Sequence, residues 1–138
     1  MGKAKTILNG IITFITLAVA PIYSIQILER YGITIPNFDA QTVLILGVIV
    51  TLFTIISGLT ERGVGAVMTF IKYLASAYYS YRVMNMFTYF IMDTPQAYAE
   101  LIIDWGLWLI LVITITLLSG IIAAIGKLAE EKKEEKRK

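Results

Sequence analysis

Three long stretches without a charged residue constrain this chain more than any other feature of its sequence. They cover residues 7–28, 40–60 and 105–126, and each is close to the ~20 apolar residues that cross a hydrocarbon core of about 30 Å. A fourth apolar stretch, 64–92, carries Lys72 near its middle. A soluble domain of 138 residues has no use for four such stretches. The sequence therefore predicts an all-α integral membrane four-helix bundle.

Composition excludes most kinds of chemistry within this chain. It contains no cysteine and no histidine, which excludes disulfides, the usual zinc sites and Ser–His or Cys–His nucleophiles. The sequence also has no glycine-rich phosphate loop and no metal-ligand spacing. We therefore expect no catalytic residues, no cofactor and no metal, and predict that the protein is not an enzyme. The net charge of +2 is too small to indicate nucleic-acid binding. Abundant Ile, Lys and Glu without Cys are typical of hyperthermophile proteins.

Proline, glycine and capping residues between the apolar stretches place the ends of the helices. We predict one membrane domain over 1–128, with helices at approximately 6–28, 41–59, 64–92 and 94–128. A charged cytoplasmic tail follows at 129–138 and continues the last helix. Pro21 should kink the first helix because proline has no N–H for the carbonyl four residues earlier. Thr16 or a neighbouring helix could donate a hydrogen bond to that carbonyl instead. Asp93 and Pro95 are interpreted as the start of the fourth helix.

Basic residues indicate the orientation of the chain. With four crossings, one side holds most of the tail together with Lys3, Lys5, Arg62 and Lys127. Arg30 is the one basic residue of the opposite loops. The positive-inside rule therefore predicts a multi-pass plasma-membrane protein with both termini in the cytoplasm. The first apolar stretch could instead be a signal peptide. It is longer than a usual h-region, and Pro21 would directly follow the cleavage site, so we predict that it is retained.

The third and fourth predicted helices are longer than a membrane requires. Residues 64–92 would extend ~43 Å at 1.5 Å per residue, whereas their first ~20 residues suffice to cross. Aromatic residues fall where an interfacial belt belongs: Tyr78, Tyr79, Tyr81, Trp105 and Trp108. We therefore predict that 83–92 and 94–103 project outward as an extracytoplasmic helical hairpin. Its apolar side chains need a cover, which the 29–41 loop or another subunit could provide.

Lys72 is the candidate functional residue. Its helical neighbours include Thr69 and Ser76, on a face of small and hydroxylic residues that is typical of helix–helix contact. A lysine at mid-membrane costs about 2.5–3.5 kcal/mol on insertion scales. Three explanations stay open: snorkelling towards cytoplasmic headgroups or Glu61; pairing with an acid, a lipid phosphate or a carbonyl of another subunit; and a working cation in an anion path or proton relay.

Two further patterns predict contacts. Arg82 and Asp104 come within about a turn of each other if the last two helices are antiparallel, which predicts a structural ion pair; a gate, or two independent snorkelling residues, are the alternatives. Small residues recur at helical spacing and predict close packing within the bundle or with partners: Gly47, Thr51, Thr54 and Gly58, then Thr116, Gly120 and Ala124.

These features together predict a non-catalytic integral membrane subunit of a larger multi-subunit assembly. Its expected partners are membrane lipids and other membrane subunits or copies of itself. The first alternative is a small homo-oligomeric channel or transporter with Lys72 lining the path. The second is a filament- or pilin-like subunit whose hydrophobic helices self-assemble.

Overall fold

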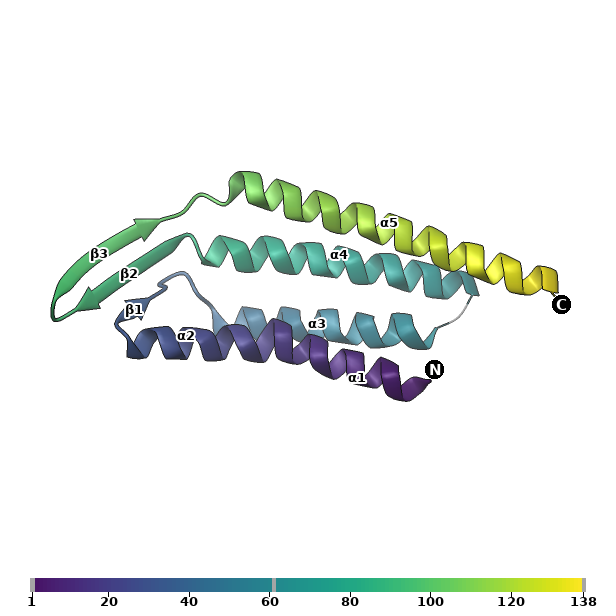
Figure 1. The fold of residues 1–138 in the computed structure, drawn as a ribbon, viewed down its shortest axis with the longest axis horizontal. Coiled ribbons are helices and arrows are strands. Elements are labelled where there is room, and N and C mark those ends of the chain that lie inside the picture. The colour runs from purple at the N-terminus through teal and green to yellow at the C-terminus, as the bar shows by residue number, and fades with distance from the viewer. Residues whose placement is uncertain (1, 61, 138) are drawn as a thin grey trace.

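Four helices and a small sheet make up the computed structural model, which describes residues 2–60 and 62–137 (Figure 1). The first helix consists of α1 (Lys3–Phe14), a π-helical turn η1 (Ile15–Val19) and α2 (Ala20–Arg30). The others are α3 (Ala40–Leu59), α4 (Arg62–Met86) and α5 (Gly106–Arg137). The strands are β1 (Ile33–Thr34), β2 (Tyr89–Thr94) and β3 (Ala97–Ile102). The sheet lies at the end of the helices opposite both chain ends.

Three helices are long and apolar enough to cross a membrane, which confirms that part of the prediction. They are Lys3–Arg30, Ala40–Leu59 and Gly106–Glu130. Within the described part of the chain α4 does not join them, because Lys72, Arg82 and several hydroxyl-bearing side chains make it less apolar. A crossing by α4 stays a prediction.

The helices pack in the order of the chain. Figure 1 shows α4 between α3 and α5, with α1 and α2 lying along α3. Glycines permit the closest approaches: a Cβ at Gly47 would lie 3.0 Å from the Cβ of Ala18, and one at Gly120 would lie 2.6 Å from the Cβ of Tyr73. The small-residue stripes therefore pack within the bundle, which was one of their two predicted roles; the other was contact with partners.

The first helix changes its winding just before Pro21. In η1 the hydrogen bonds span five residues, as in the bond from the Ala20 N–H to the Ile15 carbonyl. Pro21 has no N–H for the carbonyl of Leu17, four residues earlier. That carbonyl accepts a hydrogen bond from the Tyr79 hydroxyl of α4. The expectation that a neighbouring helix satisfies the freed carbonyl is confirmed.

The hydrophobic core lies between α3 and α4. Its buried members are Val43, Leu46, Val50, Tyr79, Val83 and Met86. The loop after α2 covers the sheet end of this core, because the rings of Phe38 and Phe87 lie 5.9 Å apart and β1 pairs with β2. Gly32 makes that approach possible: its φ is +85°, and a Cβ there would lie 2.6 Å from the Asp93 carbonyl oxygen. The loop therefore covers Phe87 and β2, which is one of the two predicted covers, whereas β3 stays exposed.

The predicted helical hairpin is wrong, because the chain forms a β-hairpin there. β2 pairs antiparallel with β3, and Thr94 lies opposite Ala97 across a two-residue turn at 95–96. The Thr94 hydroxyl accepts the Ala97 N–H at 3.1 Å and donates to the Ala97 carbonyl at 3.0 Å. Residues 88–91 are β-branched or aromatic, which favours a strand. The Pro95 turn therefore closes a hairpin, and α5 begins at Gly106 instead of at residue 94.

Candidate functional site

One face of α4 carries the predicted functional residues. Gly65, Thr69, Lys72 and Ser76 follow one another at spacings of three and four residues, which places them on one side of a helix. We call these four residues the lysine row. Gly65 and Thr69 are buried, whereas Lys72 and Ser76 are partly exposed. Tyr79 continues the row and contacts η1 through its hydroxyl, so this end of the row lies against the first helix.

The hydroxyl groups of the row have already used their protons. Thr69 donates to the Gly65 carbonyl at 2.8 Å, and Ser76 donates to the Lys72 carbonyl at 2.9 Å. Each oxygen keeps lone pairs that can accept a hydrogen bond from an ammonium group or water. A hydroxyl cannot neutralise a charge. The row therefore offers Lys72 polarity without a counter-ion.

The ammonium group of Lys72 has no hydrogen bond or ion pair to any residue that the structure describes. Its Nζ lies 4.9 Å from the centre of the Tyr73 ring, a distance at which a cation interacts with the aromatic face. Glu61, one predicted target for snorkelling, lies outside the described residues. The other two explanations for Lys72 also stay predictions.

Lys127 was missed by the sequence reasoning as a site residue. Its Nζ donates to the carbonyl of Ser57 at 2.5 Å. Ser57 lies in the last turn of α3, where carbonyls lack partners within the helix and a cation is favoured. Gly65 provides the space, since a Cβ there would lie 2.8 Å from Lys127 Cε and 3.0 Å from Nζ. Lys127 thus ties α5 to α3 across α4, and a lysine near the end of the last apolar stretch was its only signal.

Arg82 and Asp104 hold separate partners. Arg82 donates to the Tyr78 hydroxyl at 2.9 Å, with its guanidinium 5.8 Å from the Tyr78 ring centre. Asp104 accepts the Gly106 N–H at 2.9 Å and caps α5. In the described part of the chain the predicted ion pair is not formed. Instead Trp105 joins the two helices, by donating from Nε1 to the Phe87 carbonyl at 2.9 Å.

A polar cluster lies on the β-hairpin. The Tyr98 hydroxyl donates to the Glu100 carboxylate at 2.5 Å. This bond raises the pKa of Tyr98 to about 12 and holds the pKa of Glu100 below its ordinary value, with a second contribution from Tyr89. A bonded tyrosine and an anchored carboxylate stabilise the hairpin.

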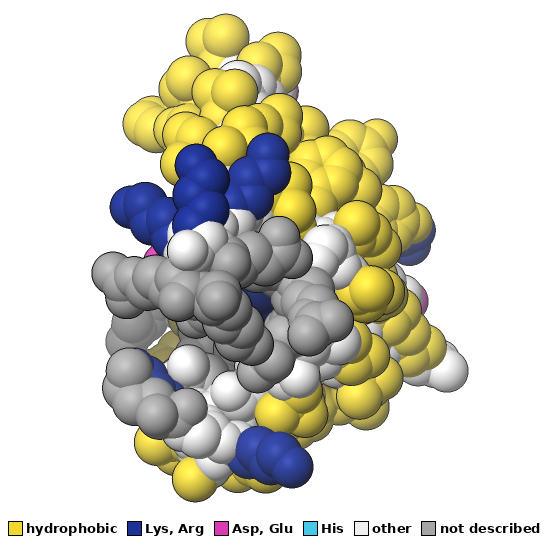
Figure 2. Space-filling model, turned by 90° about the vertical axis from the view of Figure 1, so that its right-hand side faces the viewer, with side chains coloured by type: hydrophobic (Ala, Val, Ile, Leu, Met, Phe, Trp, Pro, Cys, Tyr) yellow, Lys and Arg dark blue, Asp and Glu magenta, His cyan; other side chains and the backbone are white. Residues whose placement is uncertain are grey.

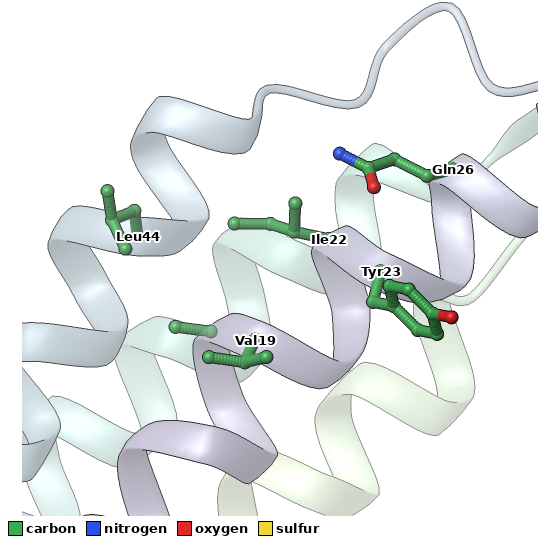
Figure 3. A pocket seen from close by; sticks show the side chains of 6 residues that line it. Val19, Ile22, Tyr23, Gln26 and Leu44 are labelled. Carbon is green, nitrogen blue, oxygen red and sulfur yellow. The ribbon is translucent and has the colours of Figure 1, made fainter.

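An apolar groove runs between the first helix and α3. It has a volume of about 260 Å³ and is lined by Ala18, Val19, Ile22, Tyr23, Gln26 and Leu44. Figure 3 shows these side chains, with Leu44 from α3 across from those of the first helix. Such a mostly apolar lining suits a hydrocarbon chain.

The described residues contain no group of three or more Asp or Glu side chains that could hold a metal ion. No protein-family model, no curated protein and no solved structure matches this chain.

Proposed function

We propose that this chain is a non-catalytic, multi-pass subunit of a larger assembly in the plasma membrane. In this arrangement all four helices cross, both termini are cytoplasmic, and the sheet lies outside. Three apolar helices support the membrane location. The position of α4 between two of these helices supports its own crossing.

The observation that carries the proposal is the exposed strand β3. All six of its residues are exposed, including Tyr98 at 62%, Leu101 at 56% and Ile102 at 76%. β3 is an edge of the sheet, whose order is β1–β2–β3. An open, apolar edge is a template for pairing with another chain, and a soluble protein normally blocks it. Outside the bilayer no hydrocarbon covers such an edge, so a partner subunit is the cover that fits.

The free hydrogen-bonding groups of β3 belong to alternate residues. The Ile103 N–H bonds to the Thr88 carbonyl at 2.8 Å, towards β2. Because backbone groups alternate along a strand, Leu101 also points its N–H at β2, whereas Tyr98, Glu100 and Ile102 point theirs at the open edge. Ile102→Pro therefore removes an N–H donor from the open edge and leaves the hydrogen bonds between β2 and β3 in place.

The proposal is tested by native mass spectrometry of the full chain, gently extracted from its own membranes. We expect other polypeptides in fixed ratio with the wild-type chain and with Ile102→Ala, which keeps the N–H. Ile102→Pro should release them. A wild-type chain that carries no other polypeptide, or an Ile102→Pro chain that keeps all of them, would contradict the proposal.

A second candidate function is a small homo-oligomeric channel. The favouring observation is Lys72, a partly buried cation whose ammonium group has no hydrogen-bond partner among the described residues. This function predicts a pure homo-oligomer and anion flux in liposomes that Lys72→Met abolishes. Flux that is equal in wild type and Lys72→Met would exclude it. Helical filaments formed by the purified chain alone would favour the self-assembling alternative instead.

A further inference from the structure

Two ammonium groups share the same side of α4. Lys127 Nζ would lie 3.0 Å from a Cβ at Gly65, which belongs to the lysine row. Gly65 precedes Lys72 by two helical turns, about 10 Å along the axis. The Cα–Cβ bond of a helical residue tilts towards the start of its helix, so the four-carbon stem of Lys72 can shorten this separation when it extends in that direction. Two like charges on one side of a helix repel each other, and more strongly where water is partly excluded.

Most of the N–H donors in this pair are unused. An ammonium group has three donors. Lys127 gives one of them to the Ser57 carbonyl, and Lys72 gives none to any described residue. A repelling pair of partly buried cations is unfavourable unless an anion joins it. The described residues supply no carboxylate there, so the structure calls for an anion with several oxygen acceptors.

The depth of the pair fits the headgroup region of a bilayer. Lys127 lies three residues before the end of the span Gly106–Glu130, where an apolar helix reaches the membrane surface. Figure 2 looks onto this end of the molecule and shows Lys and Arg side chains beside the hydrophobic surface. Basic pockets between helices near the cytoplasmic surface bind lipid headgroups. A phosphate at this depth is supplied by the membrane itself.

We propose that Lys72 and Lys127 together bind a phosphate group, namely that of an anionic phospholipid of the inner leaflet. Lys127 holds it at the headgroup level while bonded to Ser57, and Lys72 reaches it from deeper in the row. A phosphate oxygen can accept from both ammonium groups and neutralises their repulsion. The assignment to the inner leaflet rests on the proposed orientation, whereas the site itself is independent of which partner subunits the chain has.

The test uses the full chain in nanodiscs of phosphatidylcholine with a minor fraction of phosphatidylglycerol. Native mass spectrometry after mild delipidation counts the lipids that each chain keeps. We expect wild type to keep phosphatidylglycerol in preference to phosphatidylcholine, and Lys72→Met to lose at least about nine-tenths of that preference. Lys72→Arg should retain it. Lys132→Met, in the exposed charged segment of α5, is the matched control and should behave as wild type.

Competition identifies the source of the phosphate. Inorganic phosphate that displaces phosphatidylglycerol at millimolar concentration shows that the site also takes the free anion, which supports the shared chemistry. Equal retention of both lipids by wild type would overturn the proposal. Equal losses in Lys72→Met and Lys132→Met would overturn it as well, because they indicate a diffuse surface charge. If the chain instead keeps a partner polypeptide whose release depends on Lys72, the anion is a protein carboxylate and the lipid site is wrong.

Discussion

The Tyr79 hydroxyl donates a hydrogen bond to the backbone carbonyl of Leu17, at the turn that Pro21 leaves without a donor. In a bilayer an unsatisfied carbonyl costs free energy because no water is present to bond to it. One side chain of α4 thus compensates for a proline on the first helix. The bond also fixes how α4 and the first helix sit relative to each other, although α3 lies between them in chain order.

Tyr79→Phe should destabilise the protein by removing this bond while keeping the ring. We expect a loss of about 0.6–1.7 kcal/mol, between the average and the maximum measured for hydrogen bonds between membrane helices, observed as a lower thermal midpoint in detergent. Tyr81→Phe is the control, because Tyr81 is 48% exposed. Pro21→Ala restores an N–H for Leu17, so Tyr79→Phe should cost less in that background. An equal cost in both backgrounds would show that the hydroxyl acts elsewhere.

Gly65→Ala should separate α5 from α3. The added Cβ would lie 2.7 Å from the Thr60 carbonyl oxygen and 2.8 Å from Lys127 Cε, and the backbone carbonyl cannot move aside easily. Overpacking of this kind costs about 1–3 kcal/mol. Gly63→Ala, two residues earlier, meets no atom within 4 Å and should be neutral or slightly stabilising. Chemical denaturation of both variants in the same detergent makes the comparison, and similar stabilities would refute the tie through Lys127.

The β-hairpin should be most stable between moderately acidic and moderately alkaline pH. The pKa of Glu100 is lowered from 4.5 by the Tyr98 hydroxyl, so its contribution is present above that value and is lost as the pH falls through the lower folded pKa. The pKa of Tyr98 is raised from 10.0 to about 12, so its contribution is present below 10.0 and is lost as the pH rises through about 12. Ultraviolet absorbance of tyrosinate measures this titration. Glu100→Gln should return the pKa of Tyr98 towards 10.0, whereas Asp93→Asn should leave most of the rise in that pKa.

The sequence predicts the position of a helix well where a long apolar stretch determines it. α3 begins and ends within one residue of the prediction, and the first helix includes the whole predicted range. Hydropathy predicts helix over the hairpin because its apolar residues continue the long apolar stretches on either side. The residues around Pro95 also fit the capped start of a helix, although they form a two-residue β-turn. Contacts such as that between Lys127 and Ser57 join residues 70 positions apart. They depend on helix order and rotation, which hydropathy does not specify.

Gly120→Ala should disturb the packing of α5 on α4 more than Gly126→Ala on the same helix. A Cβ at Gly120 would lie 2.6 Å from the Cβ of Tyr73, whereas one at Gly126 meets nothing within 4 Å. Because a Cβ moves only with its backbone, Tyr73→Ala should not rescue Gly120→Ala, and Tyr73→Gly should recover part of the loss. We expect Gly120→Ala to cost about 1–3 kcal/mol, measured by thermal unfolding in detergent. A rescue by Tyr73→Ala would mean that the ring, and not the close approach of the two backbones, limits the spacing of these helices.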